Sequence, residues 1–350
     1  MGDLPELMQA AVLQGPGRVD VTEVPVPAMG ADDVLVSVDL CGICGSDLHM
    51  VLEGWAAPGS WQGHEWIGTV EAVGDTVTSW QPGDVVVGGP MVRCGVCAMC
   101  VAGRPSLCAD RDTPGIGLEQ GAFATYKVSP ADEVLPMPNG LAPRAAALAE
   151  PLAVALHGIH QGRVEAGQRV LVLGAGPIGA LSIAALRAMG VDDVICAEPS
   201  PARRELAVSV GASQVFHPDD LIVPSIAEPG LVVDGAVDVV LECSGKAKAM
   251  EAGLAQLVRG GMLVLVGAGI EPPRFDPNRI LLNELVITGA FTYDQGGFEE
   301  ALTLLASGAM PIDALLEPIE VPLAGLVDAM RDLAEGRLAG KVLVRPNGVA

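Results

Sequence analysis

The segment CGICGSDLH, residues 41 to 49, carries two cysteines, a serine, an aspartate and a histidine. Cys41 and Cys44 have the C-x-x-C spacing of half a structural zinc site. The glycines and Ser46 are instead typical of an active-site loop in which one thiolate binds a metal. The spacing alone does not choose between Cys41 and Cys44 as that ligand.

A second group of cysteines has the pattern C-x2-C-x2-C-x7-C and consists of Cys94, Cys97, Cys100 and Cys108. Four thiolates fill all positions of a tetrahedral zinc ion and leave none open to a substrate. The segment therefore predicts a structural zinc site, with an iron–sulfur cluster as the alternative. Cys196 and Cys243 lie in predicted buried strands, where we expect them to act as small packing residues.

The chain offers further metal-ligand types in His49, His64, Glu65 and Glu150. Glu150 is a carboxylate in the otherwise apolar run LAEPLAVALHG, and charges are rarely buried without a partner or a metal. One cysteine, one histidine and one or two carboxylates would make a site with an open position, as a catalytic zinc requires. The competing interpretation is that His64 is an ordinary core or surface histidine.

Two kinds of element must position these residues. A chain of 350 residues favours two domains. In the first third, short apolar or alternating runs between glycine turns predict the strands of a β-rich domain, at 32–40, 65–74 and 83–89. A helix at 297–308 and a last strand, GKVLVRP, follow much later, and that strand could return to the first domain.

After about residue 155, buried strands alternate with helices. Strand–turn–helix units occupy 169–190 and 193–212, further strands are predicted at 237–245 and 261–269, and a helix at 248–258. This order predicts a parallel, doubly wound α/β sheet.

The turn of the first such unit has the pattern G-x-G-x-x-G, formed by Gly174, Gly176, Pro177, Ile178 and Gly179. The pattern is weak alone, but here it follows a strand and opens a helix. Gly174 would make the tight turn, Gly176 would admit a pyrophosphate and Gly179 would let the helix pack on the strand. The helix N-terminus would then bind the phosphates of a dinucleotide.

Glu198 closes the next strand and could accept hydrogen bonds from both hydroxyls of an adenosine ribose. Its charge would repel a 2′-phosphate, so the sequence favours NAD over NADP. Arg203 and Arg204 complicate this preference because an arginine nearby can bind that phosphate. They are otherwise expected on a solvated helix surface.

The formal net charge of −23 disfavours nucleic acid or an anionic membrane surface as a partner. The long uncharged run 170–186 is divided by glycines and Pro177, which argues against a spanning helix. The N-terminal MGDLPELMQA is acidic and does not look like a secretory signal, and eight cysteines suit metal binding better than disulfides. We therefore expect a cytoplasmic protein.

In combination these motifs resemble the zinc-dependent medium-chain alcohol dehydrogenases over nearly the whole chain. The matching segments are GICGSDLH (42–49), GHEWIGTVEAVG (63–74), GDVVV (83–87), the four-cysteine segment, EP (150–151) and VLGAGPIG (172–179). Glu150 makes the sorbitol, threonine and butanediol dehydrogenase branch the most similar, because horse-liver-type enzymes have cysteine there.

The resemblance implies a GroES-like catalytic domain over 1–155, completed by 292–350, and a Rossmann domain over 156–291, with the active site in the cleft between them. It also implies a homodimer or homotetramer. Two zinc ions are expected per subunit, one catalytic and one structural.

By position, the resemblance implies Cys44, His64 and Glu150 as ligands of the catalytic zinc, with Glu65 able to approach or replace a ligand. Cys41 would then be a packing residue. The remaining roles implied are those of Asp47, which would orient His64, Ser46, which would hydrogen-bond the alcohol, and His49, which would receive the proton.

The expected reaction is hydride transfer between an alcohol or polyol and NAD, with zinc as the Lewis acid. Met50, Trp55, Trp61 and Trp66 cluster near the proposed zinc loops. They would form an apolar wall that favours secondary or cyclic alcohols, unless these side chains only pack between strands. The alternatives are a zinc-independent quinone or enoyl reductase of the same superfamily, or a non-catalytic nucleotide-binding protein.

Overall fold

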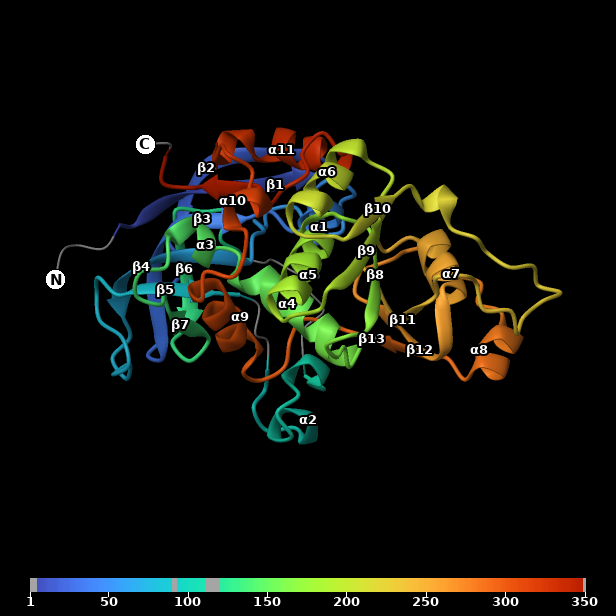
Figure 1. Cartoon of the computed structure of the whole chain (residues 1–350). Coiled ribbons are helices and arrows are strands. Elements are labelled where there is room, and N and C mark those ends of the chain that lie inside the picture. The colour runs from blue at the N-terminus through green and yellow to red at the C-terminus, as the bar shows by residue number, and fades with distance from the viewer. Residues whose placement is uncertain (1–4, 90–92, 111–119, 349–350) are drawn as a thin grey trace. The chain divides into compact units, whose positions relative to one another are not determined.

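The computed structural model describes residues 5–89, 93–110 and 120–348. The chain forms two compact units (Figure 1). The β-rich unit comprises Met1–Glu150, Phe298–Ser307 and Leu316–Ala350, and the α/β unit comprises Pro151–Gly297 and Gly308–Leu315.

The β-rich unit is built on a seven-stranded sheet in which the order β14-β15-β3-β4-β5-β7 is continuous and β6 also pairs with β3. Its strands are β3 (Asp33–Gly42), β4 (Glu65–Val73), β5 (Val85–Gly88), β6 (Tyr126–Pro130), β7 (Val134–Pro136), β14 (Val321–Pro322) and β15 (Leu343–Arg345). A separate antiparallel pair is formed by β1 (Leu7–Gly15) and β2 (Arg18–Pro25).

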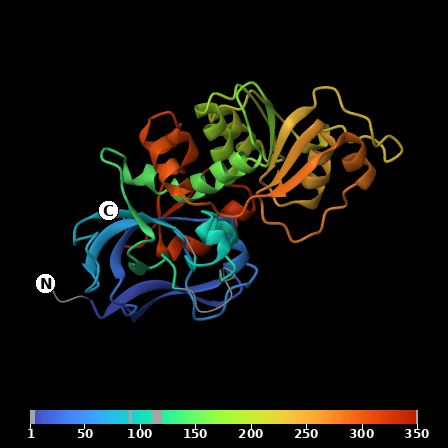
Figure 2. The same ribbon diagram turned by 90° about the horizontal axis from the view of Figure 1, so that it is seen from below.

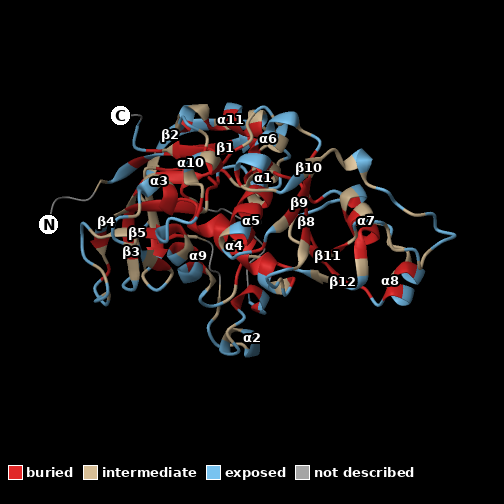
Figure 3. Ribbon diagram, viewed as in Figure 1, coloured by how far each residue is buried: buried red, intermediate tan, exposed pale blue. Residues whose placement is uncertain are grey.

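Short helices of this unit connect and cover the strands: α1 (Gly45–Val51), α2 (Ala98–Val101), α3 (Pro143–Ala146), α9 (Gly297–Ala306) and α11 (Leu326–Ala334), with the 3-10 turns η1 (Pro105–Leu107) and η3 (Leu323–Gly325). Most residues of the strands β3, β4 and β5 are buried (Figure 3). Val36, Phe123 and Met330 belong to one buried cluster that joins the sheet to α11.

The strand β15 joins this sheet although it lies far from β3 in the sequence. Leu343 pairs with Gly42 and Val344 with Cys41 in antiparallel register. β4 pairs with the same end of β3, so Cys41 also lies opposite Trp66. The segment CGICGSDLH therefore leaves the sheet at a point where three strands meet.

The α/β unit contains a six-stranded parallel sheet in the order β10-β9-β8-β11-β12-β13. Its strands are β8 (Arg169–Leu173), β9 (Asp193–Ala197), β10 (Gln214–Phe216), β11 (Val237–Glu242), β12 (Leu257–Leu265) and β13 (Val286–Gly289). The helical elements are α5 (Pro177–Ala188), α6 (Pro201–Ser209), η2 (Pro218–Asp220), α7 (Ala247–Ala255), α8 (Pro277–Asn283) and α10 (Ile312–Leu315).

Helices cover both faces of this sheet, with α5 and α6 on one face and α7 on the other (Figures 1 and 2). α4 (Ala149–Gln161) contains the point, between Glu150 and Pro151, at which the chain passes from the β-rich to the α/β unit. The predicted fold class, a β-rich domain combined with a doubly wound parallel sheet, is confirmed.

Details of the secondary structure differ from the sequence-based expectation. The sequence predicts a helix as far as residue 258, but α7 ends at Ala255 and β12 begins at Leu257. The apolar run 170–186 covers the glycine turn, most of α5 and all of β8 except for its first residue. Among the described residues, no helix is both long enough and apolar enough to cross a membrane.

Candidate active site and metal centres

Cys44, His64 and Glu65 come together in the β-rich unit. One potential ligand atom from each of them lies within 4.8 Å of the other two. Cys44 precedes the first residue of α1, and Glu65 is the first residue of β4. Gly42 makes room for this arrangement, because a Cβ at this position would lie 2.2 Å from Oε2 of Glu65.

Glu65 has a partner that the sequence interpretation missed. Lys341 Nζ donates to both carboxylate oxygens of Glu65 at 2.6 Å and to the carbonyl oxygen of Ile43 at 3.0 Å. Both charged side chains are buried. A charged residue just before an apolar strand is the signal that could have identified Lys341.

Burial and charge compete at this cluster. Burial alone would lower the pKa of Lys341, but the Glu65 carboxylate and Cys44 hold that pKa above its usual value. Burial raises the pKa of Glu150 to about 7, and the nearby His64 opposes this rise. Burial would lower the pKa of His64, but Asp47 and Cys44 hold it well above its usual range. Glu150 therefore interacts electrostatically with the cluster, although it is not one of the three residues within 4.8 Å.

Asp47 connects α1 to this cluster. Its Oδ2 accepts a hydrogen bond from the backbone N–H of Cys44 at 2.9 Å, which fixes the first turn of the helix. Its Oδ1 lies 3.7 Å from Nδ1 of His64, an ion-pair distance that is too long for a hydrogen bond. Ser46 lies in the same turn and is partly exposed.

Cys41 has a different environment from Cys44. Its side chain is fully buried in the cluster that contains Val36 and Phe123. Burial raises the pKa of the Cys41 thiol well above its usual value, which favours the protonated form. Cys41 is not part of the group of three potential ligands.

His49 and Trp55 lie together at the other end of α1. Their rings are stacked with centroids 4.9 Å apart and an interplanar angle of 19°. Trp55 is 51% exposed, whereas Met50, Trp61 and Trp66 are buried. Met50, Trp61 and Trp66 pack in the cores of the unit, which agrees with the alternative that these side chains pack between strands.

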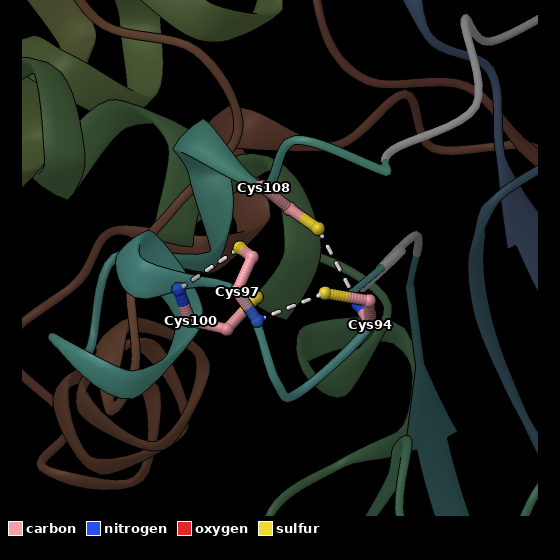
Figure 4. Close-up of side chains that lie close together, drawn as sticks. All are labelled: Cys94, Cys97, Cys100 and Cys108. Atoms are coloured by element: carbon pink, nitrogen blue, oxygen red, sulfur yellow. Dashed lines mark hydrogen bonds between the residues drawn. The ribbon is translucent and has the colours of Figure 1, made fainter.

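The four-cysteine segment folds around its own sulfur atoms (Figure 4). Potential ligand atoms of Cys94, Cys97, Cys100 and Cys108 all lie within 4.8 Å of one another. Backbone N–H groups point at three sulfurs: that of Cys94 at Cys108 Sγ (3.3 Å), that of Cys97 at Cys94 Sγ (3.3 Å) and that of Cys100 at Cys97 Sγ (3.5 Å).

These hydrogen bonds favour thiolates. The backbone N–H groups of Cys100 and Ala109 lower the pKa of Cys97 to about 6, and that of Cys94 lowers the pKa of Cys108. Desolvation raises the pKa of Cys100 to about 12. Four converging sulfurs suit a closed tetrahedral zinc site, whereas thiol, imidazole and carboxylate in the first group suit a zinc ion with an open position.

The glycine turn of the α/β unit has the geometry of a phosphate-binding loop. Gly174 has φ +89°, and a Cβ at Gly179 would lie 1.8 Å from the Gly174 carbonyl oxygen. A Cβ at Gly176 would instead meet no atom within 4 Å, so open space lies next to the backbone there. Pro177 and Ile178 are the first two residues of α5, and Gly176 is its N-cap. The N-terminus of the helix therefore lies at this turn, where its free N–H groups can bind phosphates.

Glu198 lies directly behind this turn and is buried. Its Oε2 accepts a hydrogen bond from Ala175 N–H at 2.7 Å and its Oε1 accepts one from Ser200 N–H at 2.8 Å. Arg204 donates to the carbonyl oxygens of Glu198 (2.8 Å) and Pro199 (2.7 Å), so its guanidinium has local partners. Arg203 is half-buried in the first turn of α6.

Besides Glu198, a second carboxylate, that of Glu242, lies at this edge of the sheet. The sequence interpretation missed it. It is fully buried at the end of β11 and accepts hydrogen bonds from the backbone N–H groups of Ser244 (2.8 Å) and Gly245 (3.0 Å). Burial raises the pKa of Glu242. The turn that it organises contacts the glycine loop, because a Cβ at Gly174 would lie 2.9 Å from Ser244 Cβ.

Comparison with known proteins agrees with this arrangement. The "Alcohol dehydrogenase GroES-like domain" family matches residues 30–139, and the "Zinc-binding dehydrogenase" family matches residues 177–307. Sorbitol dehydrogenase of Bacillus subtilis (strain 168) is 33% identical, over 98% of this chain and 99% of the relative. The chain belongs to the zinc-dependent medium-chain alcohol dehydrogenases. It is accordingly an oxidoreductase that transfers hydride between an alcohol and a nicotinamide cofactor.

Two solved structures extend the comparison of this alcohol dehydrogenase to its cofactor. A protein from Sinorhizobium meliloti 1021 assigned to the zinc-binding dehydrogenases, bound to NADP, is 33% identical with a TM-score of 0.85 and covers 98% of this chain and 100% of its own. A short chain alcohol dehydrogenase from E. coli CFT073 with NADH is 27% identical with a TM-score of 0.86, over 98% and 100%. Both nicotinamide cofactors thus occur among the similar structures.

Proposed function

We propose that this alcohol dehydrogenase oxidises a secondary alcohol or a polyol with NAD, and that Cys44, His64 and a glutamate hold its catalytic zinc. The observation that carries the proposal is the convergence of Cys44, His64 and Glu65 within 4.8 Å in the β-rich unit. The second group, Cys94, Cys97, Cys100 and Cys108, would hold the structural zinc.

The residues have distinct tasks in this proposal. Zinc supplies a Lewis acid for the alcohol oxygen when it is bound, and NAD supplies the hydride acceptor. Asp47 restrains His64 and the first turn of α1, and Ser46 hydrogen-bonds the alcohol hydroxyl. His49 takes up the proton that the alcohol loses.

The partners of Glu65 and Glu150 support a choice between them. Glu65 is grouped with Cys44 and His64 within 4.8 Å, and its ion pair with Lys341 holds its carboxylate in place, as hydrogen bonds do for metal-binding carboxylates. Glu150 lies within electrostatic reach of His64 and is the alternative or exchanging ligand. We assign the direct position to Glu65.

The preference for NAD over NADP rests on Glu198. A 2′-phosphate beside this buried carboxylate would meet like charge, and Arg204 is already hydrogen-bonded to backbone oxygens. A polyol substrate is supported by the sorbitol dehydrogenase relative. The eight unpaired cysteines suit a reducing compartment, and we propose the cytoplasm.

One experiment tests the proposed function directly. NAD-linked oxidation is measured across a panel of secondary alcohols, cyclic alcohols and polyols, with zinc content determined by mass spectrometry before and after chelation. The proposal expects two zinc ions per chain and loss of turnover on chelation. Full activity in zinc-free protein would contradict it and would favour the zinc-independent reductases.

We also propose self-association into a dimer or a tetramer. The strand β13 ends the six-stranded sheet, and within the described residues its outer edge has no partner strand. Val286 at the start of this strand and Leu281 and Leu282 on the preceding helix α8 expose apolar side chains. Two copies related by a two-fold axis would pair identical edges. The variant Leu281→Glu should dissociate the assembly. Light scattering, which measures the molar mass of the variant and of wild type, tests this contact.

A further inference from the structure

His49 is held from two sides within the β-rich unit. Its Nδ1 lies 2.9 Å from Oε1 of Glu53, which follows it by four residues. Its imidazole ring stacks on the indole ring of Trp55. Both contacts come from the segment directly after α1, so they belong to one local piece of structure.

The backbone of this segment is shaped to return Trp55 onto His49. Gly54 adopts φ +77°, and a Cβ there would lie 2.5 Å from Cγ of Pro16. The backbone N–H of Trp55 then donates to the carbonyl oxygen of His49 at 3.3 Å. Because only glycine adopts this conformation readily, the stack is built into the turn. The backbone of the turn thus holds the rings of His49 and Trp55 together without a bound substrate or cofactor.

The two nitrogens of His49 are therefore not equivalent. Nδ1 is buried and has no aligned hydrogen-bond partner among the described residues, but the Glu53 carboxylate lies within 2.9 Å of it. The Glu53 side chain is 45% exposed, so it can rotate into line with an N–H on this nitrogen. A carboxylate at Nδ1 favours the tautomer that carries its proton there and leaves Nε2 as the acceptor.

We propose that Glu53 and Trp55 are positioning residues for His49, and that Glu53 passes the reaction proton to water. This inference rests on the proposed role of His49. In alcohol oxidation the carbinol hydrogen leaves as hydride to NAD, and the hydroxyl proton is taken up at Nε2. The imidazolium gives its Nδ1 proton to Glu53, which releases it to solvent. One proton leaves per turnover, and the neutral ring regains its first tautomer by exchange with water.

The surroundings of His49 fit the middle of this route, where the ring carries a positive charge. The imidazolium formed there faces the Glu53 carboxylate and stacks on the ring of Trp55. Trp55 also fixes the plane of the ring, so Nε2 stays directed during turnover. A side chain without an aromatic face at residue 55 would leave the imidazole free to turn.

The test compares Glu53→Gln and Trp55→Leu with wild type. For Glu53→Gln we expect kcat for alcohol oxidation to fall about 10- to 100-fold with little change in KM. Added imidazole should restore the rate in a concentration-dependent manner, and the D2O effect on kcat should increase. Trp55→Leu should lose activity similarly, whereas Trp55→Phe should retain most of it.

Glu23→Gln is the matched control, because Glu23 is an exposed carboxylate on β2. It should behave as wild type, and zinc content should be equal in all variants. Wild-type kcat in Glu53→Gln, or a loss that imidazole does not restore, would overturn the inference. If His49→Ala impairs the active wild-type enzyme while Glu53→Gln does not, only this inference fails. An inactive wild type would overturn the proposed function as well.

Discussion

Lys341 and Glu65 form a buried ion pair in which Nζ lies 2.6 Å from both carboxylate oxygens. The two side chains are 2% and 0% exposed. Such a pair gains little over apolar residues of the same shape, but removing one partner leaves an uncompensated buried charge. Lys341 thus balances the charge of Glu65 in the group of candidate ligands without offering a ligand of its own.

Lys341→Met should lower the free energy of unfolding of the zinc-free protein by roughly 3–5 kcal/mol, because Glu65 would be left buried and unpaired. Urea denaturation in the presence of a chelator measures this change. The double variant Lys341→Met with Glu65→Gln should regain a large part of the loss. If Lys341→Met and wild type were equally stable, Lys341 would not be needed to compensate the buried charge of Glu65.

Cys44→Ser should abolish turnover and remove one zinc ion per chain, whereas Cys41→Ser should keep both zinc ions and most of the activity. The reason is that Cys41 lies in the core, outside the ligand group. The buried hydroxyl should still destabilise Cys41→Ser by about 1 kcal/mol. Elemental analysis and steady-state kinetics check both variants. An equal loss of zinc from the two would contradict the assignment of Cys44.

Cys100→Ser should reduce the zinc content from two ions to about one per chain, because a closed tetrahedral site needs all four thiolates. Thermal unfolding should then occur at a lower temperature. Native mass spectrometry reads the number of ions, and Cys243→Ser is a suitable control because Cys243 is outside both ligand groups. Retention of two zinc ions by Cys100→Ser would argue against a four-cysteine site.

The zinc-free protein should become less stable as the pH rises from about 4.5 to about 7. In this range folded Glu150, with a pKa of about 7, keeps a proton that the unfolded chain, with its ordinary value of 4.5, has lost. Unfolding then costs up to about 1.4 kcal/mol less per pH unit. Chemical denaturation at several pH values tests this slope. Glu150→Gln should flatten it, and an unchanged slope in that variant would assign the effect to other groups.

Glu198→Ala should weaken the preference for NAD over NADP about 10- to 100-fold in kcat/KM, the worth of a hydrogen bond to a charged group. The side chain lies behind the glycine loop and would no longer repel a 2′-phosphate. Glu205→Ala, an exposed change on the helix α6 that follows Glu198, is the control. A cofactor ratio that Glu198→Ala leaves unchanged would place the discrimination elsewhere.

Local patterns were sufficient to predict the fold class. The apolar strand β8, the glycine turn and Pro177 at the start of α5 are adjacent in sequence, and their physical reasons are local. The four cysteines were predicted as one group for the same reason, since 14 residues separate the first from the last.

The partners of the other candidate ligands could not be predicted in this way. Lys341 is 276 residues from Glu65, and no spacing rule connects them before β15 is known to pair with β3. The two interpretations of the tryptophans could not be separated for a related reason: Trp61 and Trp66 are near the candidate ligands in sequence, but only the packing shows that they are buried. Glu242 was missed because a single carboxylate at the end of a strand belongs to no sequence motif with a defined spacing.

The ion pair between Glu65 and Lys341 closes a loop that contains the whole of the α/β unit. During biosynthesis, residues 151–297 are available in one piece and can fold while the sheet of the other unit still lacks β15. A chain interrupted within the α/β unit would carry Cys44, His64, Glu65 and Glu150 but not the cation that balances them. We therefore expect the proposed metal site to be completed late, so that finished enzyme retains zinc better than nascent chains do.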